Sequence, residues 1–270
     1  MRHKKILLFL ILALLIALSG CTDILTLQKE NRELKAWVEA LQAETDNLYQ
    51  LFEDISLEVV PANVMIYTYC YKTAFGIIYD EVGGQGSGVI ISSDSENYYV
   101  LTNNHVISSK PGYPRVEHEI YDYKMNKTRG FVVFSDPNYD LAVVRFRKSI
   151  ELAILPLANK NPVKGDRVVA IGQPEGQLNV ITFGKVINYI LPNCSDCNPS
   201  ESSVNFPCIL HDSFTNHGNS GGMLINHQKE IVGINTFGST DTSYGLAVPV
   251  EKIQAFLAEH DFLFNNERID

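Results

Sequence analysis

The chain has 270 residues, of which 45% are apolar and 20% are charged, and its formal net charge is −9. This length permits one or two globular domains with a sizeable core. The acidic charge excludes nucleic-acid binding as an expected function, because such binding depends mostly on neutralising phosphates with Lys and Arg.

The first twenty residues have the composition of an export signal. Three cations, Arg2, Lys4 and Lys5, precede an apolar run over residues 6–18, and small residues follow it. A basic head, a short apolar middle and small residues at the end are typical of a segment that directs secretion and is then removed. The run is shorter than the roughly 20 apolar residues of a membrane-spanning helix. We therefore predict a signal peptide over residues 1–20.

The end of this segment, Leu18-Ser19-Gly20-Cys21, resembles a bacterial lipobox. The resemblance implies cleavage before Cys21 and attachment of lipid to Cys21, which would hold the mature chain at a membrane of a bacterial cell envelope. An ordinary signal peptide and an uncleaved anchor are the alternatives, and all three place the folded part outside the cytoplasm. Cleavage would also remove three cations and change the formal net charge from −9 to −12.

A seven-residue apolar repeat follows the signal. Its members are Leu27, Leu34, Leu41, Leu48 and Ile55, and the other positions of the same seam are Ile24, Asn31, Val38, Thr45 and Phe52. Charged residues fill the positions outside the seam, as in a coiled coil. We therefore predict a lipid anchor and coiled-coil stalk over residues 21–58, with self-association through residues 24–58. The alternative is a single amphipathic helix that lies on its own domain or on lipid.

After Pro61 the chain alternates short β-branched and aromatic runs with turns rich in Gly, Pro, Asn, Asp and Ser, which predicts an all-β domain. The predicted strands cover residues 64–67, 88–91, 98–101, 130–133 and 141–144 in a first group, and 167–171, 179–187, 203–210, 223–225, 231–236 and 246–250 in a second. Two groups of short strands favour a pair of antiparallel barrels. Residues 251–262 carry apolar residues at helical spacing and predict a C-terminal helix.

The glycine-rich segment Gly218-Asn219-Ser220-Gly221-Gly222 lies between two apolar runs. Glycines permit tight turns and the close approach of other groups. A serine nucleophile needs an exposed hydroxyl on such a turn and nearby backbone N–H groups that can stabilise an oxyanion. For this motif alone, a glycine-rich hairpin turn is the alternative.

A serine nucleophile also needs a base, usually histidine, and a carboxylate that orients the base. His105 directly follows one predicted strand, and Asp140 directly precedes another. Taken alone, His105 could be a loop histidine and Asp140 a turn residue. Asp136 is the alternative carboxylate, but Asp140 abuts the core strand. His105 and Asp140 are therefore the candidate partners of Ser220.

Seven sequence blocks, taken together and in order, resemble trypsin-like serine proteases of the HtrA/Deg type. They are Gly86-Ser87-Gly88-Val89-Ile90-Ile91, Thr102-Asn103-Asn104-His105-Val106, Asp140-Leu141-Ala142-Val143, Ala170-Ile171-Gly172-Gln173-Pro174, Gly218-Asn219-Ser220-Gly221-Gly222, Gly233-Ile234-Asn235 and Gly245-Leu246-Ala247-Val248-Pro249. The resemblance covers about residues 59–262 and implies a protease domain over residues 59–270 with a chymotrypsin-like fold of two six-stranded β-barrels. It implies His105 as general base, Asp140 as the residue that orients it, and Ser220 as nucleophile.

The same resemblance places an oxyanion hole at the N–H groups of Gly218 and Ser220, with Asn219 shaping the loop, and implies no cofactor. Asn219 stands where proteases activated by cleavage carry an aspartate, so we expect no zymogen cleavage. His217 stands where the family commonly has proline. Because about twenty residues follow Pro249 in the sequence, we expect no PDZ domain of the kind that longer family members carry.

The primary specificity pocket is expected between the residues that precede the serine and a later strand. The substrate-binding candidates are Phe214, Thr215, Asn235, Thr236 and Phe237, with Ser213 beside them. No acidic residue stands at the expected base of this pocket unless Asp212 turns inward. We therefore expect a small or medium uncharged side chain, rather than lysine or arginine, before the scissile bond.

Cys194, Cys197, Cys208 and His211 have the spacing C-x2-C-x10-C-x2-H, which is close to that of a structural zinc site. An exported chain more often pairs its cysteines in disulfides. We therefore expect a disulfide or free thiols and no bound metal. A zinc ion on these four residues is the less favoured alternative. Cys70 has no evident partner.

These observations predict a membrane-anchored serine endopeptidase of protein quality control that cleaves exported, misfolded or unstructured proteins. The alternatives are a protease-like substrate-binding or chaperone module with little turnover, and a coiled-coil surface scaffold. The expected partners are polypeptide substrates, a membrane through lipid on Cys21, and other copies of the chain through residues 24–58.

Overall fold

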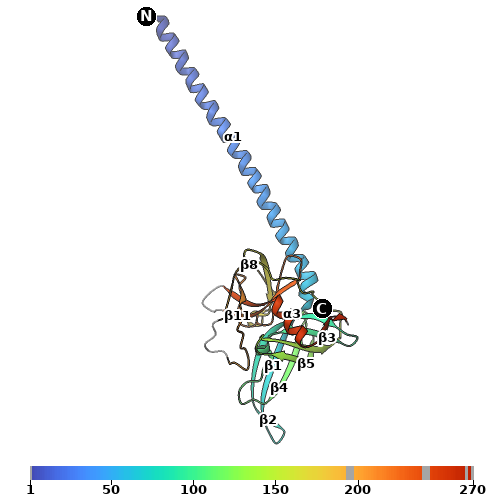
Figure 1. Cartoon of the computed structure of the whole chain (residues 1–270). Helices are drawn as coiled ribbons and strands as arrows, with labels where there is room; N and C mark the ends of the chain where they lie inside the picture. Colours follow the sequence, from blue (N-terminus) through green and yellow to red (C-terminus); the bar gives the residue numbers. More distant parts are fainter. Residues whose placement is uncertain (1, 193–197, 239–243, 265–266, 269–270) are drawn as a thin grey trace. The chain divides into compact units, whose positions relative to one another are not determined.

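The computed structural model describes the backbone of residues 2–192, 198–238, 244–264 and 267–268. The chain divides into two compact units, Met1–Asp54 and Ile55–Asp270. The first unit is one long α-helix, and the second contains all the strands of the described residues (Figure 1).

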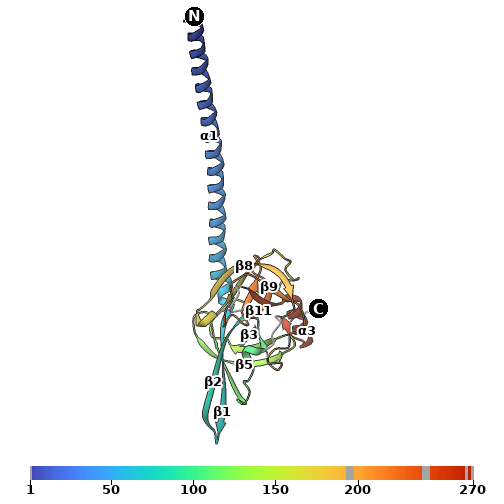
Figure 2. The same cartoon turned by 90° about the vertical axis from the view of Figure 1, so that its left-hand side faces the viewer.

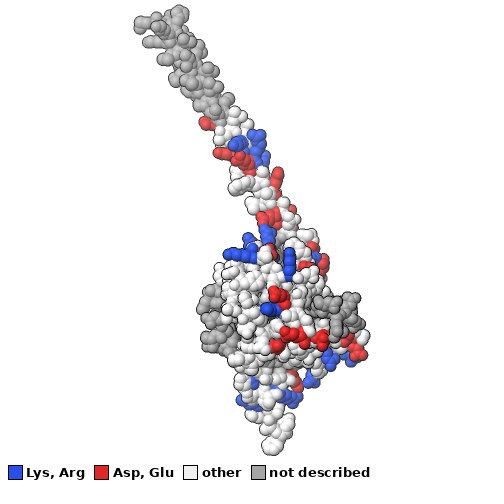
Figure 3. All heavy atoms as spheres, in the orientation of Figure 1, with Lys and Arg blue, Asp and Glu red and all other residues white. Residues whose placement is uncertain are grey.

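The N-terminal helix α1 (Arg2–Asp54) is 53 residues long, which confirms the predicted helix. Three leucines of the predicted seam are exposed in this single chain, with 63%, 62% and 61% of the surface of Leu27, Leu34 and Leu41 accessible. Charges of both signs flank them (Figure 3), including the Lys29–Glu33 ion pair at 3.8 Å. In the described residues, no helix carries an apolar stretch that is long enough to cross a membrane.

The second unit begins with two short helical turns that are part of its core. A π-helical turn, η1 (Ile55–Val59), is followed by a 3₁₀ turn, η2 (Val60–Ala62). Ile55, Val59 and Ala62 are fully buried. Pro61 lies in η2, and proline cannot continue a helix because it lacks an N–H and clashes with the preceding turn. The helical path therefore ends here and the first strand begins.

The first barrel is a closed antiparallel sheet of six strands in the order β1-β2-β3-β6-β5-β4. The strands are β1 (Asn63–Ala74), β2 (Ile77–Ser93), β3 (Asn97–Thr102), β4 (Arg115–Tyr121), β5 (Lys127–Asp136) and β6 (Leu141–Arg147). A one-turn helix, α2 (Asn104–Ile107), directly follows β3.

The second barrel is also closed, antiparallel and six-stranded, in the order β10-β11-β12-β9-β8-β7. Its strands are β7 (Arg167–Gly172), β8 (Val180–Ile190), β9 (Cys208–His211), β10 (Met223–Ile225), β11 (Ile231–Gly238) and β12 (Gly245–Pro249). The remaining elements are the 3₁₀ turn η3 (Pro174–Gly176), the helix α3 (Val250–Glu259) and the short strands β13 (Leu263–Phe264) and β14 (Glu267–Arg268). The predicted all-β, chymotrypsin-like pair of six-stranded barrels and the C-terminal helix are confirmed.

The five strands predicted for the first barrel are all longer in the structure than predicted, β2 most of all, and two further strands differ in other ways. β4 (Arg115–Tyr121) has no counterpart among the predicted strands, because its four charged or histidine side chains hide the apolar alternation in which only His118 and Ile120 are buried. β9 starts at Cys208, although the apolar pattern predicted a strand from residue 203. β9 pairs with β8 only at residues 208–211, and residues 203–207 before it are irregular.

Close packing between strands explains one of the glycines in the first barrel. Gly88 in β2 faces Val100 of β3, and a Cβ at Gly88 would lie 2.4 Å from the Val100 Cγ1 atom. Ile66 of β1 lies on the same side, with its Cδ1 3.1 Å from that point. Only a residue without a side chain allows this close approach.

The β1–β2 hairpin extends beyond the rest of the first barrel (Figure 2). Phe75 and Gly76 form its turn with φ values of 51° and 80°, so both residues are left-handed, as a two-residue type I′ hairpin turn requires. Phe75, Ile77 and Tyr79 are largely exposed at this end of the hairpin.

Two buried histidines lie in the barrels, His118 in β4 and His211 in β9. The Thr68 hydroxyl donates to the Val106 carbonyl at 2.7 Å, so the His118 Nδ1–H donates to the Thr68 hydroxyl at 3.0 Å. Burial lowers the pKa of His118 from 6.5 to about 4 and lowers the pKa of His211 to about 4 as well. Both rings are therefore neutral in the folded protein at neutral pH.

These two histidines predict loss of stability in mild acid. The unfolded chain takes up protons at a pKa of about 6.5, whereas the folded chain resists them, so the free energy of unfolding should fall as pH drops from about 6.5 toward 4. Urea denaturation at pH 7.0, 5.5 and 4.5 measures this loss. His118→Asn should reduce the loss by roughly 2 kcal/mol at pH 4.5, whereas the exposed His227→Asn should not change it. If His118→Asn lost as much unfolding free energy between pH 7.0 and 4.5 as the wild type, the conclusion that His118 is neutral in the folded protein would be contradicted.

Candidate active site

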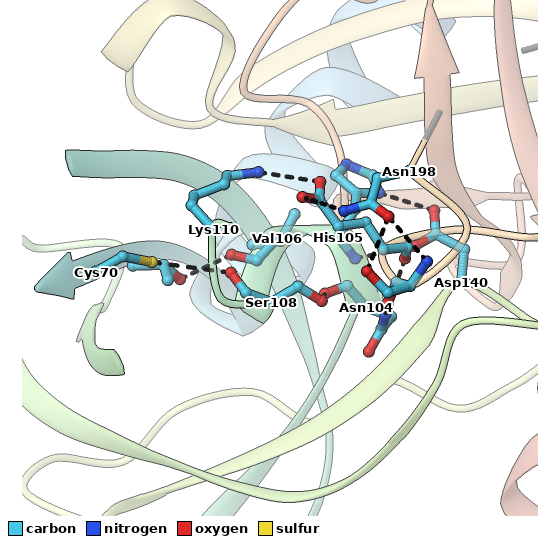
Figure 4. A network of polar contacts seen from close by, with 11 residues as sticks. Cys70, Asn104, His105, Val106, Ser108, Lys110, Asp140 and Asn198 are labelled. Carbon is cyan, nitrogen blue, oxygen red and sulfur yellow. Dashed lines mark hydrogen bonds and ion pairs between the residues drawn. The ribbon is translucent and has the colours of Figure 1, made fainter. Parts of the chain in front are cut away.

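His105 lies in the one-turn helix α2 and points toward Asp140 (Figure 4). Its main-chain N–H donates to Asp140 Oδ1 at 3.0 Å, and its ring Nδ1 lies 2.8 Å from Asp140 Oδ2. An ionised carboxylate only accepts hydrogen bonds, so Nδ1 carries the proton of this pair. In the neutral ring, Nε2 is then left with a free lone pair, as a general base requires.

Asp140 occupies the end of the turn between β5 and β6 in a strained conformation. Its φ is 51°, in the left-handed region that non-glycine residues rarely adopt, and its side chain is completely buried. The Asp140 N–H donates to the Pro137 carbonyl, and the Asp140 carbonyl accepts from the Asn103 side chain at 2.8 Å. These bonds fix the backbone so that the carboxylate faces His105.

Polar contacts also anchor the helix that carries His105. The Asn104 side chain donates to the carbonyl of Glu201 at 2.8 Å, and Lys110 forms an ion pair with the Glu201 carboxylate at 3.0 Å. Asn198 lies in the same network (Figure 4). The described end of the segment between β8 and β9 is thereby attached to α2, beside His105.

Ser220 lies on a loop with left-handed glycines on both sides. Gly218 has a φ of 99° and Gly221 a φ of 83°. The Ser220 hydroxyl donates to the Thr236 carbonyl at 3.1 Å, and the Gly221 N–H donates to the Asn235 carbonyl at 2.8 Å. The loop therefore rests against β11, and in this state the hydroxyl is bonded to the main chain of β11.

A hydrogen bond to Glu175 sets the orientation of the peptide before Gly218. The His217 carbonyl accepts from the Glu175 N–H at 2.8 Å. In a trans peptide the carbonyl and the following N–H point in opposite directions, so the Gly218 N–H points away from Glu175. Among the described residues, no acceptor is bonded to the N–H of Gly218 or of Ser220.

Contacts with η3 hold this loop in place. The Asn216 side chain donates to the Glu175 carboxylate at 2.6 Å. A Cβ at Gly218 would lie 2.4 Å from the Gln173 carbonyl oxygen, so the two segments are in direct contact. Glu175 is a residue that the sequence analysis missed, because a glutamate in a short turn has no distinguishing pattern.

Ser87 joins the first barrel to the loop that carries Ser220. Its N–H donates to the Ser220 carbonyl at 2.7 Å, and its hydroxyl donates to the Gly218 carbonyl at 2.6 Å. The same hydroxyl accepts from the Gln173 N–H at 2.9 Å. The sequence analysis placed Ser87 in a block shared with proteases but assigned it no role.

Two of the predicted substrate-binding residues contact the predicted triad, and a third lies beside them on β11. The Thr236 hydroxyl donates to Asp140 Oδ2, and the Phe237 ring stacks on the His105 ring with 6.4 Å between centroids. The Asn235 side chain is buried and donates to the Met223 carbonyl at 3.1 Å. Thr236 is thus a direct partner of the carboxylate that orients His105.

The residues before Ser220 alternate between the inside and the outside of the barrel. Ser213 and Thr215 are buried, whereas Phe214 is exposed. Asp212 is also exposed, and its carboxylate accepts from the Lys185 N–H at 2.6 Å. Asp212 therefore does not turn inward and supplies no acidic base to the predicted pocket.

The cysteine and histidine set lies only partly within the described residues. Cys194 and Cys197 lie outside them. Cys208 and His211 are buried at the two ends of β9, and residues three apart on a strand face opposite sides. Cys70 and Cys208 are unbridged, and no cluster of three metal-binding side chains occurs among the described residues. Burial and the charge of Asp140 raise the pKa of the Cys208 thiol to about 12, so Cys208 is a poor nucleophile.

The chain matches the family model of the trypsin-like peptidase domain over residues 86–234. It is 29% identical over 214 residues to the serine protease HTRA1 of Xenopus tropicalis, an alignment that covers 78% of this chain and 43% of that protein. It is 29% identical over 188 residues to the serine protease Do-like HtrB of Bacillus subtilis, covering 68% of this chain and 39% of HtrB.

A third relative is a DegP-like protein of Buchnera aphidicola, named as a periplasmic serine endoprotease. The two are 34% identical over 175 residues, which cover 62% of this chain and 34% of the relative. The chain spans less than half the length of each of these three relatives.

The left-handed conformation of Gly218 predicts a large effect of a single methyl group. Gly218→Ala would place a Cβ 2.4 Å from the Gln173 carbonyl at a φ of 99°, so the Gly218 N–H should leave its present position. We expect the rate at which a fluorophosphonate modifies Ser220 to fall by about 10²-fold or more. Gly84→Ala is the control, since no atom lies within 4 Å of its added Cβ. An unchanged rate in folded Gly218→Ala would contradict the proposed role of this N–H.

Proposed function

This chain belongs to the family of trypsin-like peptidase domains, and on that premise we propose that it is a serine endopeptidase with the triad His105, Asp140 and Ser220. The observation that carries the proposal is the buried Asp140 carboxylate, which binds both the main-chain N–H and the ring Nδ1 of His105. A completely buried carboxylate that orients a partly exposed imidazole is the arrangement that serine hydrolysis requires.

The proposed reaction starts with proton transfer from Ser220 to Nε2 of His105 as the serine oxygen attacks a peptide carbonyl. Asp140 stabilises the imidazolium that forms. The N–H groups of Gly218 and Ser220 stabilise the oxyanion, and Asn219 shapes their loop. His105 then gives its proton to the leaving amine. Water next attacks the acyl-enzyme as His105 takes its proton, and His105 returns that proton to the Ser220 oxygen when the carboxylic acid product leaves.

The hydrogen bond from Ser220 to the Thr236 carbonyl describes the state without substrate. Catalytic hydrogen bonds are often long or misaligned before substrate binds. In the proposed mechanism the Ser220 hydroxyl leaves the Thr236 carbonyl and donates to Nε2 of His105 when substrate binds. Only the Ser220 side chain has to move in this step, because the bonds from Ser87 and Glu175 already hold the main chain of the loop.

We also propose that the enzyme works outside the cytoplasm on exported, misfolded or unstructured polypeptides. The basic and apolar segment over residues 1–20 and the lipobox-like Cys21 support a lipid-anchored protein of the bacterial envelope. The name of the Buchnera aphidicola relative assigns that protein to the periplasm. In this proposal residues 21–58 are the anchor and stalk, and residues 59–270 are the protease domain.

Self-association of the stalk is proposed from its exposed seam. Leu27, Leu34, Leu41 and Leu48 are at least half exposed along α1. Unpaired leucines at seven-residue spacing favour a coiled coil between copies of the chain. Thr45 in the same seam donates to the Leu41 carbonyl at 2.8 Å, which satisfies its hydroxyl within its own helix.

The triad predicts the pattern of labelling by a fluorophosphonate probe. The purified full chain should be labelled, and Ser220→Ala and His105→Ala should abolish labelling. Asp140→Asn should slow it by about 10⁴-fold, because the wrong tautomer of His105 is then favoured. The exposed Ser95→Ala is the matched control and should be labelled at the normal rate. A full chain without labelling would overturn the enzyme proposal and favour a module that binds polypeptides without cleaving them.

The stalk proposal predicts the oligomeric state of the lipid-free chain 22–270. Sedimentation equilibrium should give a multiple of the chain mass, and a double change of Leu34→Asp and Leu41→Asp should reduce it to one chain, because charges cannot be buried in the seam. Lys35→Ala with Glu39→Ala, outside the seam, is the control and should stay associated. A wild-type chain that stays monomeric at about 50 μM would contradict the proposed coiled coil, because its dissociation constant would then lie above that concentration.

A further inference from the structure

Four buried polar side chains near Ser220 have atoms without a hydrogen-bond partner. The atoms are both ring nitrogens of His211, the hydroxyls of Ser213 and Thr215, and Oδ1 of Asn235. They are five of the eight such side-chain atoms in the described part of the chain. Buried polar groups are nearly always hydrogen-bonded, so this concentration of unpaired atoms at one place indicates a site that a ligand completes. We call these four residues the polar cluster.

The first three members face the same side of the chain. His211, Ser213 and Thr215 are buried, and the residues between them, Asp212 and Phe214, are exposed. This alternation is the two-residue period of an extended chain, whose alternate side chains share a face. Thr215 Oγ1 and His211 Nε2 lie 2.6 and 2.8 Å from the same point, the position that a Cβ of the glycine at 245 would occupy.

Asn235 belongs to β11, which is separated from β9 by the single strand β12. Its side chain lies beside the His211 ring and opposes the lowering of the pKa of His211 by burial, although the two side chains form no hydrogen bond of normal geometry. Its main chain is bonded to the nucleophile loop, since its N–H donates to Gly222 at 2.9 Å and its carbonyl accepts from Gly221 at 2.8 Å. The polar cluster is therefore attached to the loop of the nucleophile.

Two glycines pack closely against the polar cluster. A Cβ at Gly184 of β8 would lie 2.5 Å from the Ser213 hydroxyl, and a Cβ at Gly245 of β12 would lie 2.6 Å from the Thr215 hydroxyl. A side chain at either position would displace these hydroxyls, so both strands use glycine to hold the polar cluster in its present arrangement.

We propose that the polar cluster binds the side chain on the acyl side of the scissile bond, and that this side chain is a neutral carboxamide, glutamine or asparagine. This inference rests on the proposed endopeptidase function. It narrows the small or medium uncharged side chain expected from the sequence to one with hydrogen-bonding groups.

The donors and acceptors of the polar cluster match an amide. A neutral His211 has one donor and one acceptor, each hydroxyl has both, and Asn235 Oδ1 only accepts. A carboxamide supplies two N–H donors and a carbonyl acceptor, so it can pair with both kinds of group. A carboxylate has no donor for Asn235 Oδ1 and would be a buried charge. A lysine would also be a buried charge, and none of the four residues of the polar cluster is an acid that could pair with it. An apolar side chain would leave all five atoms unpaired.

The first test measures kcat/KM of the full chain with peptides that differ only in the residue before the scissile bond. We expect glutamine or asparagine to exceed alanine, leucine, glutamate and lysine by about 10²-fold or more. Thr215→Val and Ser213→Ala should each reduce this preference by at least about 10-fold, since they remove one hydroxyl at nearly constant shape. Thr128→Val, in β5 of the first barrel, is the control and should keep the preference. Labelled enzyme that cleaves after leucine or alanine as well as after glutamine would overturn the inference and leave the endopeptidase function standing.

The second test needs no turnover. Peptides that end in glutamine, glutamate or leucine are titrated against full-length Ser220→Ala, and binding is followed by NMR shifts. We expect the glutamine peptide to bind at least about 10-fold more tightly than the other two, and Thr215→Val in the same background to remove the difference. Equal binding of the three peptides would overturn the inference even if the enzyme proves inactive.

Discussion

The buried carboxylate of Asp140 is the constraint on which the site and the joining of the two barrels depend. A charge without access to water must be met by protein donors, because an unpaired buried charge is strongly destabilising. The donors are the main-chain N–H and ring of His105, from α2 of the first barrel, and the Thr236 hydroxyl, from β11 of the second. The charge is satisfied only when both barrels are in place, so correct assembly of the fold and correct orientation of His105 are one requirement.

The conformation of the loop that carries Ser220 also depends on residues that are distant in the sequence. Ser87 of the first barrel binds the carbonyls of Gly218 and Ser220, and Glu175 of the second barrel binds the carbonyl of His217. The bond to the His217 carbonyl directs the following N–H of Gly218 away from Glu175. A bulky His217, in place of the proline common in the family, is compatible with this geometry because only its main chain is used.

The polar cluster places a cost on stability inside an otherwise well-packed barrel. Its surroundings are apolar, with Ala170, Ile209, Leu224 and Ala247 in the core of the same barrel. Unpaired polar atoms in such surroundings weaken the fold by about 1–3 kcal/mol each, and natural proteins keep such departures from good packing mainly at functional sites. If the polar cluster binds the substrate side chain, these unpaired atoms make binding selective, because only a hydrogen-bonding side chain gives them partners.

The amino-acid sequence by itself determined the long N-terminal helix, the two groups of strands and the identity of His105, Asp140 and Ser220 as candidates, because helical and strand periods and short glycine-rich motifs are local properties. It missed β4, whose charged residues conceal a weak alternation, and it assigned no role to Ser87 or Glu175. Only the tertiary structure decided that Thr236 binds Asp140, that Phe214 and Asp212 face outward, and that His211 joins Ser213, Thr215 and Asn235. These relations join residues far apart in the chain, and their physical basis is barrel closure, which brings separate strands within hydrogen-bonding distance and leaves no trace in local spacing.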